Sequence, residues 1–494
     1  MMTDWTDFIE CQRGLLIAPA GHGKTTAIAD CLLQCPDKSR QLILTHTHAG
    51  IASLRKKFQE QSIPTNKYQL ETITGFAQRY VIGFLGSSVL PDESDSNYFS
   101  EAIGKCRVLM QSKLVQTVIQ SSYDGVFVDE YQDCTIDQHE MIMELAYNLP
   151  LHLLGDPLQG IFSFESKPLV DFDKDLGLFT RFDCLSSPWR WQNSNPELGQ
   201  EILRIRRCLE NQKSIVLRHN PAKGFYVFPL SVDDNDNYKL CSRLLSAHDS
   251  ESLLVLCPSY RDTDKFGRPV FRGRFTDRVS IKQRIDYGNR FTVIDAIDSD
   301  GDYQCAKKID EFITQCAQKR RIKKIAHFYN VLLLLHLNKT KLNLWIDRKG
   351  NRFIPKKKEN AVLSKALLDD FSNFESSPTL CQLQTLIKRV VSLPDIKYYH
   401  HDLYILINRC FQIAQTNSIS MFEAMKLAKS RMRHQGRKIH GRIIGTTLLT
   451  KGLEFDTVLV WNAHKFEDAK NFYVAISRAC KKLIIMTNNT VIQF

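Results

Sequence analysis

The chain has 494 residues, of which 43% are hydrophobic and 24% charged, values typical of a folded globular protein with roughly two to four domains. The longest apolar run, Val331–Leu335, is too short to span a bilayer, and the acidic N-terminus lacks a signal-peptide pattern, so we expect a cytoplasmic protein without a membrane segment. Fourteen cysteines without a C-x-x-C pair indicate free thiols, and they argue against a disulfide framework.

The net charge of +12 is concentrated in one part of the chain. Residues 301–435 carry 24 basic and 11 acidic side chains, whereas residues 1–300 carry 33 and 39. This basic segment includes the runs Lys319–Arg321 and Lys356–Lys358. The aromatic residues interleaved with its charges are Phe328, Tyr329, Trp345 and Phe353. Such mixtures bind single-stranded nucleic acid by stacking and phosphate contacts, although helical periodicity also favours core positions for these aromatics.

The first informative stretch is a glycine-containing loop between a predicted strand and a predicted helix. Leu15–Ile17 is a short apolar run, and a helix is expected over Thr26–Leu33. Glycines let the loop backbone point its N–H groups at a nucleotide triphosphate, and the helix N-terminus adds its own preference for anions. The residues predicted to contact the nucleotide are Ala18, Pro19, Ala20, Gly21, His22, Gly23, Lys24, Thr25 and Thr26.

Further strands and helices alternate along the first half of the chain. The predicted strands are Gln41–Thr45, Val126–Val128 and Leu151–Leu154, and helices are expected over Ile51–Gln59 and Ile73–Val81. This alternation predicts an α/β fold with a parallel sheet, in which ligands gather at the carboxyl ends of the strands.

Polar residues follow two of these strands directly. Asp129 and Glu130 come after Val126–Val128, and Gln159 lies just beyond Leu151–Leu154. Phosphoryl transfer requires a metal at the phosphates and an oriented water. We therefore predict that Asp129 and the Thr25 hydroxyl hold Mg²⁺, that Lys24 reaches the outer phosphates, and that Glu130 orients or deprotonates the water. An acidic pair at this position could alternatively cap the next helix.

Three motifs together identify a family resemblance. A-P-A-G-H-G-K-T, V-D-E-Y-Q-D and L-G-D-P-L-Q-G-I-F-S-F are similar to motifs of superfamily 1 helicases of the UvrD/Rep type, in which the leading alanine of the loop is usual. The resemblance implies a second recA-like domain with two arginine fingers. Arg190 in L-S-S-P-W-R-W and Arg478 in Y-V-A-I-S-R-A match those positions.

The resemblance also implies roles for several other residues. Glu454 of K-G-L-E-F would contact the ribose, Lys451 would lie near the nucleotide and DNA, and Gln159 would act in catalysis. Gln12 stands six residues before Ala18 and is a candidate for the adenine-contacting glutamine.

The implied fold has two recA-like P-loop NTPase core domains with parallel sheets, each interrupted by a mainly helical insertion. We expect the first core domain to comprise residues 1–76 and 121–182, with a small helical insertion at 77–120. The second core domain would comprise residues 183–300 and 436–494, and the basic segment 301–435 would be its accessory insertion.

The DNA-facing positions match the family less completely. The implied DNA contacts are Phe162, Phe164, Thr45, Thr72 and Lys451. Phe164 would be a base-stacking platform, although both phenylalanines could instead be core residues at a strand end. Where the family usually has other residues, this chain has Glu165, Ile73, His46, His48, Ala49 and Leu448. ATP hydrolysis is therefore better supported than processive unwinding.

Two functions are compatible with these motifs. The first is an ATP- and Mg²⁺-dependent translocase or helicase on single-stranded or 3′-tailed DNA. The second is a regulatory or DNA-sensing ATPase subunit that accompanies a separate nuclease in a defence or repair complex. Compact UvrD-like subunits of this length occur in Gabija-type antiphage systems, and this chain resembles them in size.

Overall fold

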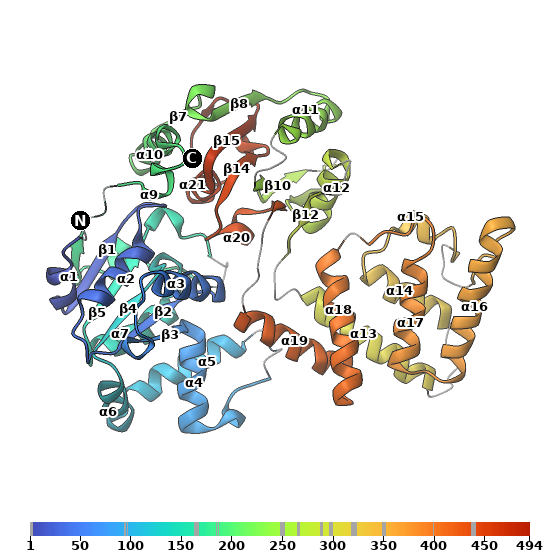
Figure 1. The fold of residues 1–494 in the computed structure, drawn as a ribbon, viewed down its shortest axis with the longest axis horizontal. Helices are drawn as coiled ribbons and strands as arrows, with labels where there is room; N and C mark the ends of the chain where they lie inside the picture. Colours follow the sequence, from blue (N-terminus) through green and yellow to red (C-terminus); the bar gives the residue numbers. More distant parts are fainter. Residues whose placement is uncertain are drawn as a thin grey trace. The chain divides into compact units, whose positions relative to one another are not determined.

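The computed structural model in Figure 1 describes most of the chain. The described residues are 3–92, 95, 97–162, 167–183, 185, 187–247, 252–263, 267–286, 290–295, 300–317, 324–347, 352–398, 400–435 and 441–494. They form two compact units: the first comprises Met1–Phe291 and Gly436–Phe494, and the second comprises Thr292–Gln435.

The first unit contains a six-stranded parallel sheet made by the first part of the chain. Its strands are β1 (Arg13–Ile17), β2 (Gln41–Thr45), β3 (Tyr68–Thr72), β4 (Gly125–Val128), β5 (Leu151–Gly155) and β6 (Thr180–Phe182). Their order is β3-β2-β4-β5-β1-β6, and every neighbouring pair is parallel. The predicted strands are confirmed, and the carboxyl ends of all six meet at one edge.

Helices cover both faces of this sheet (Figure 1). Their bounds are α1 (Thr6–Glu10), α2 (Lys24–Gln34), α3 (His48–Glu60), α4 (Ile73–Leu85), α5 (Tyr98–Met110), α6 (Lys113–Ser122), α7 (Ile136–Ala146) and α8 (Phe172–Asp175). Successive strand residues point to opposite faces, so Leu16 packs with α2 and α3 while Leu15 packs with α4, α5 and α7. Burial on both faces explains why these strands are continuous apolar runs rather than alternating ones.

Helices α4, α5 and α6 share a hydrophobic core with the first sheet. Phe76 of α4, Ile103 of α5 and Ile119 of α6 are fully buried or nearly so, and they belong to the same cluster as Leu42 and Val126. This segment, which includes residues 77–120, is therefore packed as part of the first α/β layer.

The first unit also contains a second sheet. Its strands in this unit are β8 (Phe225–Pro229), β9 (Leu253–Leu256), β13 (Arg442–Gly445), β14 (Phe455–Val460) and β15 (Ala479–Thr487), in the order β13-β9-β14-β15-β8. The pairs from β13 to β8 are parallel. The accompanying helices are α9 (Trp189–Gln192), α10 (Pro196–Glu210), α11 (Asp234–Ser246), α12 (Phe275–Ile285), α20 (Thr447–Thr450) and α21 (Ala469–Ile476). Two short antiparallel pairs are β7 (Ile215–Val216) with β16 (Val491–Ile492), and β10 (Tyr260–Thr263) with β11 (Pro269–Arg272).

In the described residues the second unit consists of helices apart from one short strand, β12 (Thr292–Val293). Its helices are α13 (Asp300–Ala317), α14 (Lys324–Leu334), α15 (Lys339–Leu342), α16 (Ala361–Ser376), α17 (Leu380–Val391), α18 (His401–Asn417) and α19 (Met421–Gln435). The four aromatics interleaved with its charges are all buried in its core, which confirms the core alternative for them. The run Lys319–Arg321 lies outside the described residues. Among the described helices, none combines the length and apolar character needed to cross a lipid bilayer.

A buried histidine makes the first sheet sensitive to acid. His152 of β5 is 2% exposed, its ring stacks on Phe127 at 4.7 Å, and Nε2 lies 3.1 Å from the carbonyl of Cys11. Burial lowers the pKa of His152 to about 4. Because the unfolded chain binds this proton near pH 6.5, stability is fully present above pH 6.5 and falls as the pH drops toward 4. We expect the wild-type unfolding free energy to fall by about 2 kcal/mol more than that of His152→Gln between pH 6.5 and 4.5 in urea titrations. Equal slopes would contradict this assignment.

Candidate functional site

A cavity of about 570 Å³ opens at the carboxyl edge of the first sheet and is lined from both sheets of the first unit. Of the residues predicted from the sequence, those that line it are Ala20, Gly21, Gly23, Lys24, Thr25, Thr26, Thr45, Asp129, Glu130, Gln159, Phe162, Arg190, Lys451, Glu454 and Arg478. Parts of the chain up to 458 positions apart thus contribute to one site. This gathering follows from the parallel strands, which place their following loops on one side.

The loop between β1 and α2 depends on glycine at two positions. Gly21 and Gly23 have φ angles of +71° and +90°, in the left-handed region that favours glycine. A Cβ atom on Gly21 would also lie 2.7 Å from Cβ of Arg190. The loop therefore turns sharply into α2, which begins at Lys24, two residues before the predicted start.

Lys24 is held by its own loop. Its ammonium group donates to the carbonyl oxygen of Ala18 at 2.8 Å and to that of Pro19 at 3.3 Å. The side chain is buried beside the cavity, with Thr25 and Thr26 in the first turn of the same helix. An ammonium at this place, next to a helix N-terminus, gives the cavity floor a preference for anions.

The two carboxylates that follow β4 have opposite pKa shifts. Burial, reinforced by the neighbouring Glu130, raises the pKa of Asp129 to about 7. Burial also acts to raise the pKa of Glu130, but the Lys24 and Lys451 ammonium groups outweigh it and lower that pKa. Glu130 adopts a left-handed φ of +55° and accepts a hydrogen bond from the Gln132 amide. Glu130 is therefore a carboxylate at neutral pH, able to accept a proton from a water molecule.

Gln159 bridges an aspartate and an arginine. Its amide nitrogen donates to Oδ2 of Asp156 at 2.8 Å, and its amide oxygen accepts from Arg478 at 3.2 Å. A carboxylate can only accept and a guanidinium can only donate, so these two neighbours fix the orientation of the amide. Arg478 is 1% exposed and also donates to the carbonyls of Val474 and Leu453. Burial and the nearby Arg190 lower the pKa of Arg478 to about 10, which keeps it charged at neutral pH.

Arg190 connects the glycine loop to the second sheet. Its guanidinium contacts the Glu454 carboxylate through Nε at 2.9 Å and Nη2 at 2.7 Å, and Nη1 donates to the carbonyl of Ser477 at 2.6 Å. Its backbone N–H donates to the carbonyl of Gly21 at 3.0 Å. The structure thus brings both predicted arginines to the cavity, and Glu454 with them.

Lys451 lines the cavity, but its ammonium group is already paired with protein oxygen atoms. Its ammonium group pairs with the Asp133 carboxylate and the carbonyl of Gln159, and the side chain is 6% exposed. It also lies 5.0 Å from the ring centre of Phe162. The aromatic ring predicted to contact DNA is therefore covered on one side by the lysine predicted to do the same.

Several predicted residues do not line the cavity. Gln12 is exposed at the amino end of β1, the end opposite the loop. Thr72 caps helix α4, where its hydroxyl accepts from the Gly75 N–H at 3.0 Å. Ala18, Pro19 and His22 shape the loop without lining the cavity, and His22 bonds through Nδ1 to the carbonyl of Ala20. Phe164 lies outside the described residues.

Sequence reasoning missed residues that the structure brings to this site. Trp189 lines the cavity, is 58% exposed, and would meet a Cβ on Gly23 at 3.2 Å. The sequence contained a signal for Trp189, because this aromatic residue directly precedes Arg190 in P-W-R-W. Asp156 and Arg206 form a buried ion pair of 2.7 Å behind Gln159. Asp156 stands in the motif G-D-P-L-Q, but Arg206 lies in an ordinary amphipathic helix and carries no motif signal.

The donor set fits a small hard cation. The Thr25 hydroxyl and the Asp129 carboxylate line the same cavity and supply the oxygen atoms that Mg²⁺ prefers. Among the described residues, no group of three or more His, Cys, Asp or Glu side chains is arranged to hold a metal by itself.

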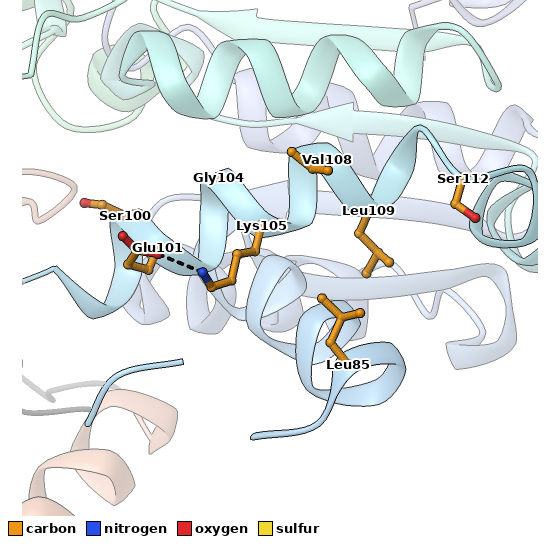
Figure 2. Close-up of a pocket in the computed structure, with 8 residues that line it drawn as sticks. All are labelled: Leu85, Ser100, Glu101, Gly104, Lys105, Val108, Leu109 and Ser112. Carbon is orange, nitrogen blue, oxygen red and sulfur yellow. Dashed lines mark hydrogen bonds and ion pairs between the residues drawn. The ribbon is translucent and has the colours of Figure 1, made fainter. Parts of the chain in front are cut away.

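A second cavity, of about 520 Å³, lies on helices α4 and α5 (Figure 2). Leu85 of α4 faces Leu109 of α5 across it, and Lys105 pairs with Glu101 at its side at 2.9 Å. None of the predicted catalytic, nucleotide-binding or DNA-binding residues lines it.

Comparisons with known proteins agree with the motifs. Residues 92–172 match the UvrD/REP helicase N-terminal domain. The chain is 29% identical over 101 residues, 20% of its length, to an ATP-dependent helicase/nuclease subunit from Alkaliphilus metalliredigens, of which 8% is covered. It is 28% identical over 88 residues, 17% of its length, to the RecBCD enzyme subunit RecB from Buchnera aphidicola, of which 7% is covered. It is also 28% identical over 120 residues, 22% of its length, to the Gabija protein GajB from Bacillus cereus, of which 24% is covered. The resemblance to UvrD-like helicases is confirmed, and the matches span a quarter or less of each relative.

Proposed function

We propose that this chain, which carries the match to the UvrD/REP helicase N-terminal domain, is an ATP-dependent translocase or helicase on single-stranded or 3′-tailed DNA. The observation that carries the proposal is one cavity lined by Lys24, Glu130, Gln159, Arg190 and Arg478. These are the groups that phosphoryl transfer to water requires: a phosphate cradle, a proton acceptor and positive charge for the transition state.

Each side chain has a chemical task in this proposal. Lys24 and the loop amides bind the phosphates, and Glu130 holds the attacking water and accepts its proton. Arg190 and Arg478 stabilise negative charge that develops on the transferred phosphoryl group. Mg²⁺ held by Thr25 and Asp129 would neutralise charge on the outer phosphates. Trp189 and Glu454 both line the cavity. In this proposal, the exposed Trp189 ring would stack on the base and Glu454 would contact the ribose.

The architecture supports a motor with two core domains. We assign residues 1–76 and 121–182 to a first recA-like domain and residues 183–300 and 436–494 to a second, with 77–120 and 301–435 as helical insertions. Because residues from both sheets line the cavity, hydrolysis and release there would change how the two sheets pack. Phe162 and Thr45, at the same cavity, would transmit that change to a bound strand.

A second candidate function is an ATPase subunit that senses DNA and works with a separate nuclease. The specific observation that favours it is the internal pairing of Lys451 with Asp133, which leaves a predicted DNA contact occupied. Two of the relatives are named as subunits of a helicase/nuclease and of the RecBCD enzyme, and a third as a Gabija protein.

One experiment separates the two functions. ATP hydrolysis is measured with and without single-stranded DNA, and strand displacement is then followed on a 3′-tailed duplex. Strong stimulation together with displacement supports the motor. Hydrolysis without displacement supports the sensing role, and the absence of ATP hydrolysis under all conditions would overturn both.

The exposed lysine run of the second unit gives a prediction about DNA affinity. Lys357 and Lys358 are exposed, and the Lys356 ammonium lies 5.4 Å from the ring centre of Trp345. Replacing all three by Gln removes three positive charges from a segment with a charge of +13. We expect weaker single-strand binding and a slope of log K against log salt that is shallower by about 2, since each phosphate contact contributes about 0.7.

The matched control replaces Lys113, Lys174 and Lys213, three exposed lysines of the first unit, by Gln. It changes the net charge equally but should leave the slope unchanged. If both triple variants give the same slope, the run is only a solvated surface. Fluorescence anisotropy of a labelled oligonucleotide at four salt concentrations measures both slopes.

A further inference from the structure

A tyrosine of the second sheet region holds the glycine loop of the first sheet. Tyr473 lies on α21, is fully buried, and its hydroxyl oxygen accepts a hydrogen bond from the Ala20 N–H at 3.2 Å. The two residues are 453 positions apart in the chain. This bond is a direct link between the loop of residues 18–23 and the helix that leads to Arg478.

The direction of the Ala20 N–H shows whether this group can bind a phosphate in the cavity or holds the loop backbone. Ala20 lines the cavity, whereas Tyr473 is not among the residues that line it. The N–H therefore points behind the loop, and its task is to hold the backbone rather than to bind a phosphate. Ala20 is 3% exposed. If the hydroxyl were removed, the buried Ala20 N–H would therefore have lost its hydrogen-bond acceptor.

Arg206 also contacts the tyrosine. Its guanidinium lies 5.1 Å from the ring centre of Tyr473 and pairs with Asp156 at 2.7 Å. Asp156 is fully buried, and the same carboxylate oxygen accepts from the Gln159 amide. A continuous set of contacts thus runs from the loop through Tyr473, Arg206 and Asp156 to Gln159 and Arg478.

We propose that Tyr473 is a positioning residue for the phosphate loop: its hydroxyl, in a ring supported by Arg206, fixes the Ala20 amide and so presets the shape of the loop for a nucleotide triphosphate. The ligand class and the reaction rest on the proposed function, but the restraint on the loop does not. When the loop is already ordered, less of the binding free energy is lost in ordering its backbone. The tyrosine therefore strengthens ATP binding without contacting ATP.

The test uses Tyr473→Phe, which keeps the ring and removes the hydroxyl oxygen that interacts with the Ala20 N–H and with Arg206. Hydrogen–deuterium exchange is measured on peptides covering residues 17–24 of the nucleotide-free full chain. We expect these amides to exchange about tenfold faster, because the Ala20 N–H loses its buried acceptor. The Kd and KM for ATP should rise by about tenfold, while kcat changes less than threefold.

Tyr123→Phe is the matched control. The Tyr123 hydroxyl is also buried in the first unit and accepts a hydrogen bond at 3.2 Å, from Arg79, but it is remote from the cavity lining. This variant should leave loop exchange and the KM for ATP unchanged. Unchanged loop exchange in Tyr473→Phe, or equal acceleration across the chain in both variants, would overturn the proposal. If the wild-type chain fails to bind ATP, the proposed function is overturned. Faster loop exchange in Tyr473→Phe would even then show that Tyr473 restrains the loop.

Discussion

Glu130→Gln should abolish ATP turnover while retaining ATP binding. The amide has the same shape as the carboxylate and can still accept the hydrogen bond from Gln132, but it cannot take a proton from water. Removal of a general base typically costs between about 10² and 10⁴ in rate, so we expect kcat to fall into that range with the Kd for ATP within about threefold of wild type. Phosphate release and calorimetric titration measure the two quantities.

The matched control for this variant is Asp137→Asn. Asp137 is an exposed acid in the first turn of α7, seven residues further along the chain, and its replacement removes the same charge. It should leave kcat unchanged. Turnover near the wild-type rate in Glu130→Gln would exclude Glu130 as the proton acceptor and would leave helix capping or loop geometry as its role.

Arg478→Ala should reduce kcat by about 10³ or more, since an arginine that stabilises the phosphoryl-transfer transition state contributes between about 10³ and 10⁵. Added guanidinium ion should restore part of the lost rate, because the small cation can enter the space that the side chain leaves and present the same donors. Steady-state ATPase rates with millimolar guanidinium chloride, far below denaturing concentrations, test this expectation.

Chemical rescue separates catalysis from folding at this buried position. Arg478 donates to the carbonyls of Val474 and Leu453, so its loss also costs stability, and the melting temperature is recorded alongside the rate. Arg181→Ala serves as the control, since Arg181 of β6 forms an exposed ion pair with Asp173 of α8. Its activity should neither fall nor respond to guanidinium. A rate loss in Arg478→Ala that guanidinium cannot reverse, with unchanged stability, would contradict the direct role.

Four of the six strands of the first sheet could be predicted because local sequence determines them, whereas β3 and β6, which are partly polar and lie at the sheet edges, were not predicted. Gln41–Thr45 and Leu151–Leu154 are apolar runs of strand length, and burial on both faces requires such runs. The grouping of Lys24, Asp129 and Gln159 could be predicted for a related reason, since each follows a parallel strand and the carboxyl ends share one edge.

Other features depend on contacts between distant parts of the chain and left no local signal. The buried ion pair of Arg206 with Asp156 joins a helix of one region to a motif of another, and Arg206 has the spacing of an ordinary amphipathic helix residue. Lys451 was expected to face DNA, but the Asp133 carboxylate occupies its ammonium group. No pattern in K-G-L-E-F distinguishes a lysine that is exposed from one that is paired internally.

The pairing of the cavity cations has a thermodynamic consequence. Lys24 binds loop carbonyls, Arg190 binds Glu454, Arg478 binds Gln159, and Lys451 binds Asp133. Under the proposed function, phosphate oxygens would replace oxygen atoms that these groups already hold, and ATP binding would be an exchange of partners. The net gain in binding free energy would then be smaller than the sum of the new contacts. When product leaves, each cation would return to an oxygen atom of the protein, so the cavity would favour fast turnover over tight binding of nucleotide.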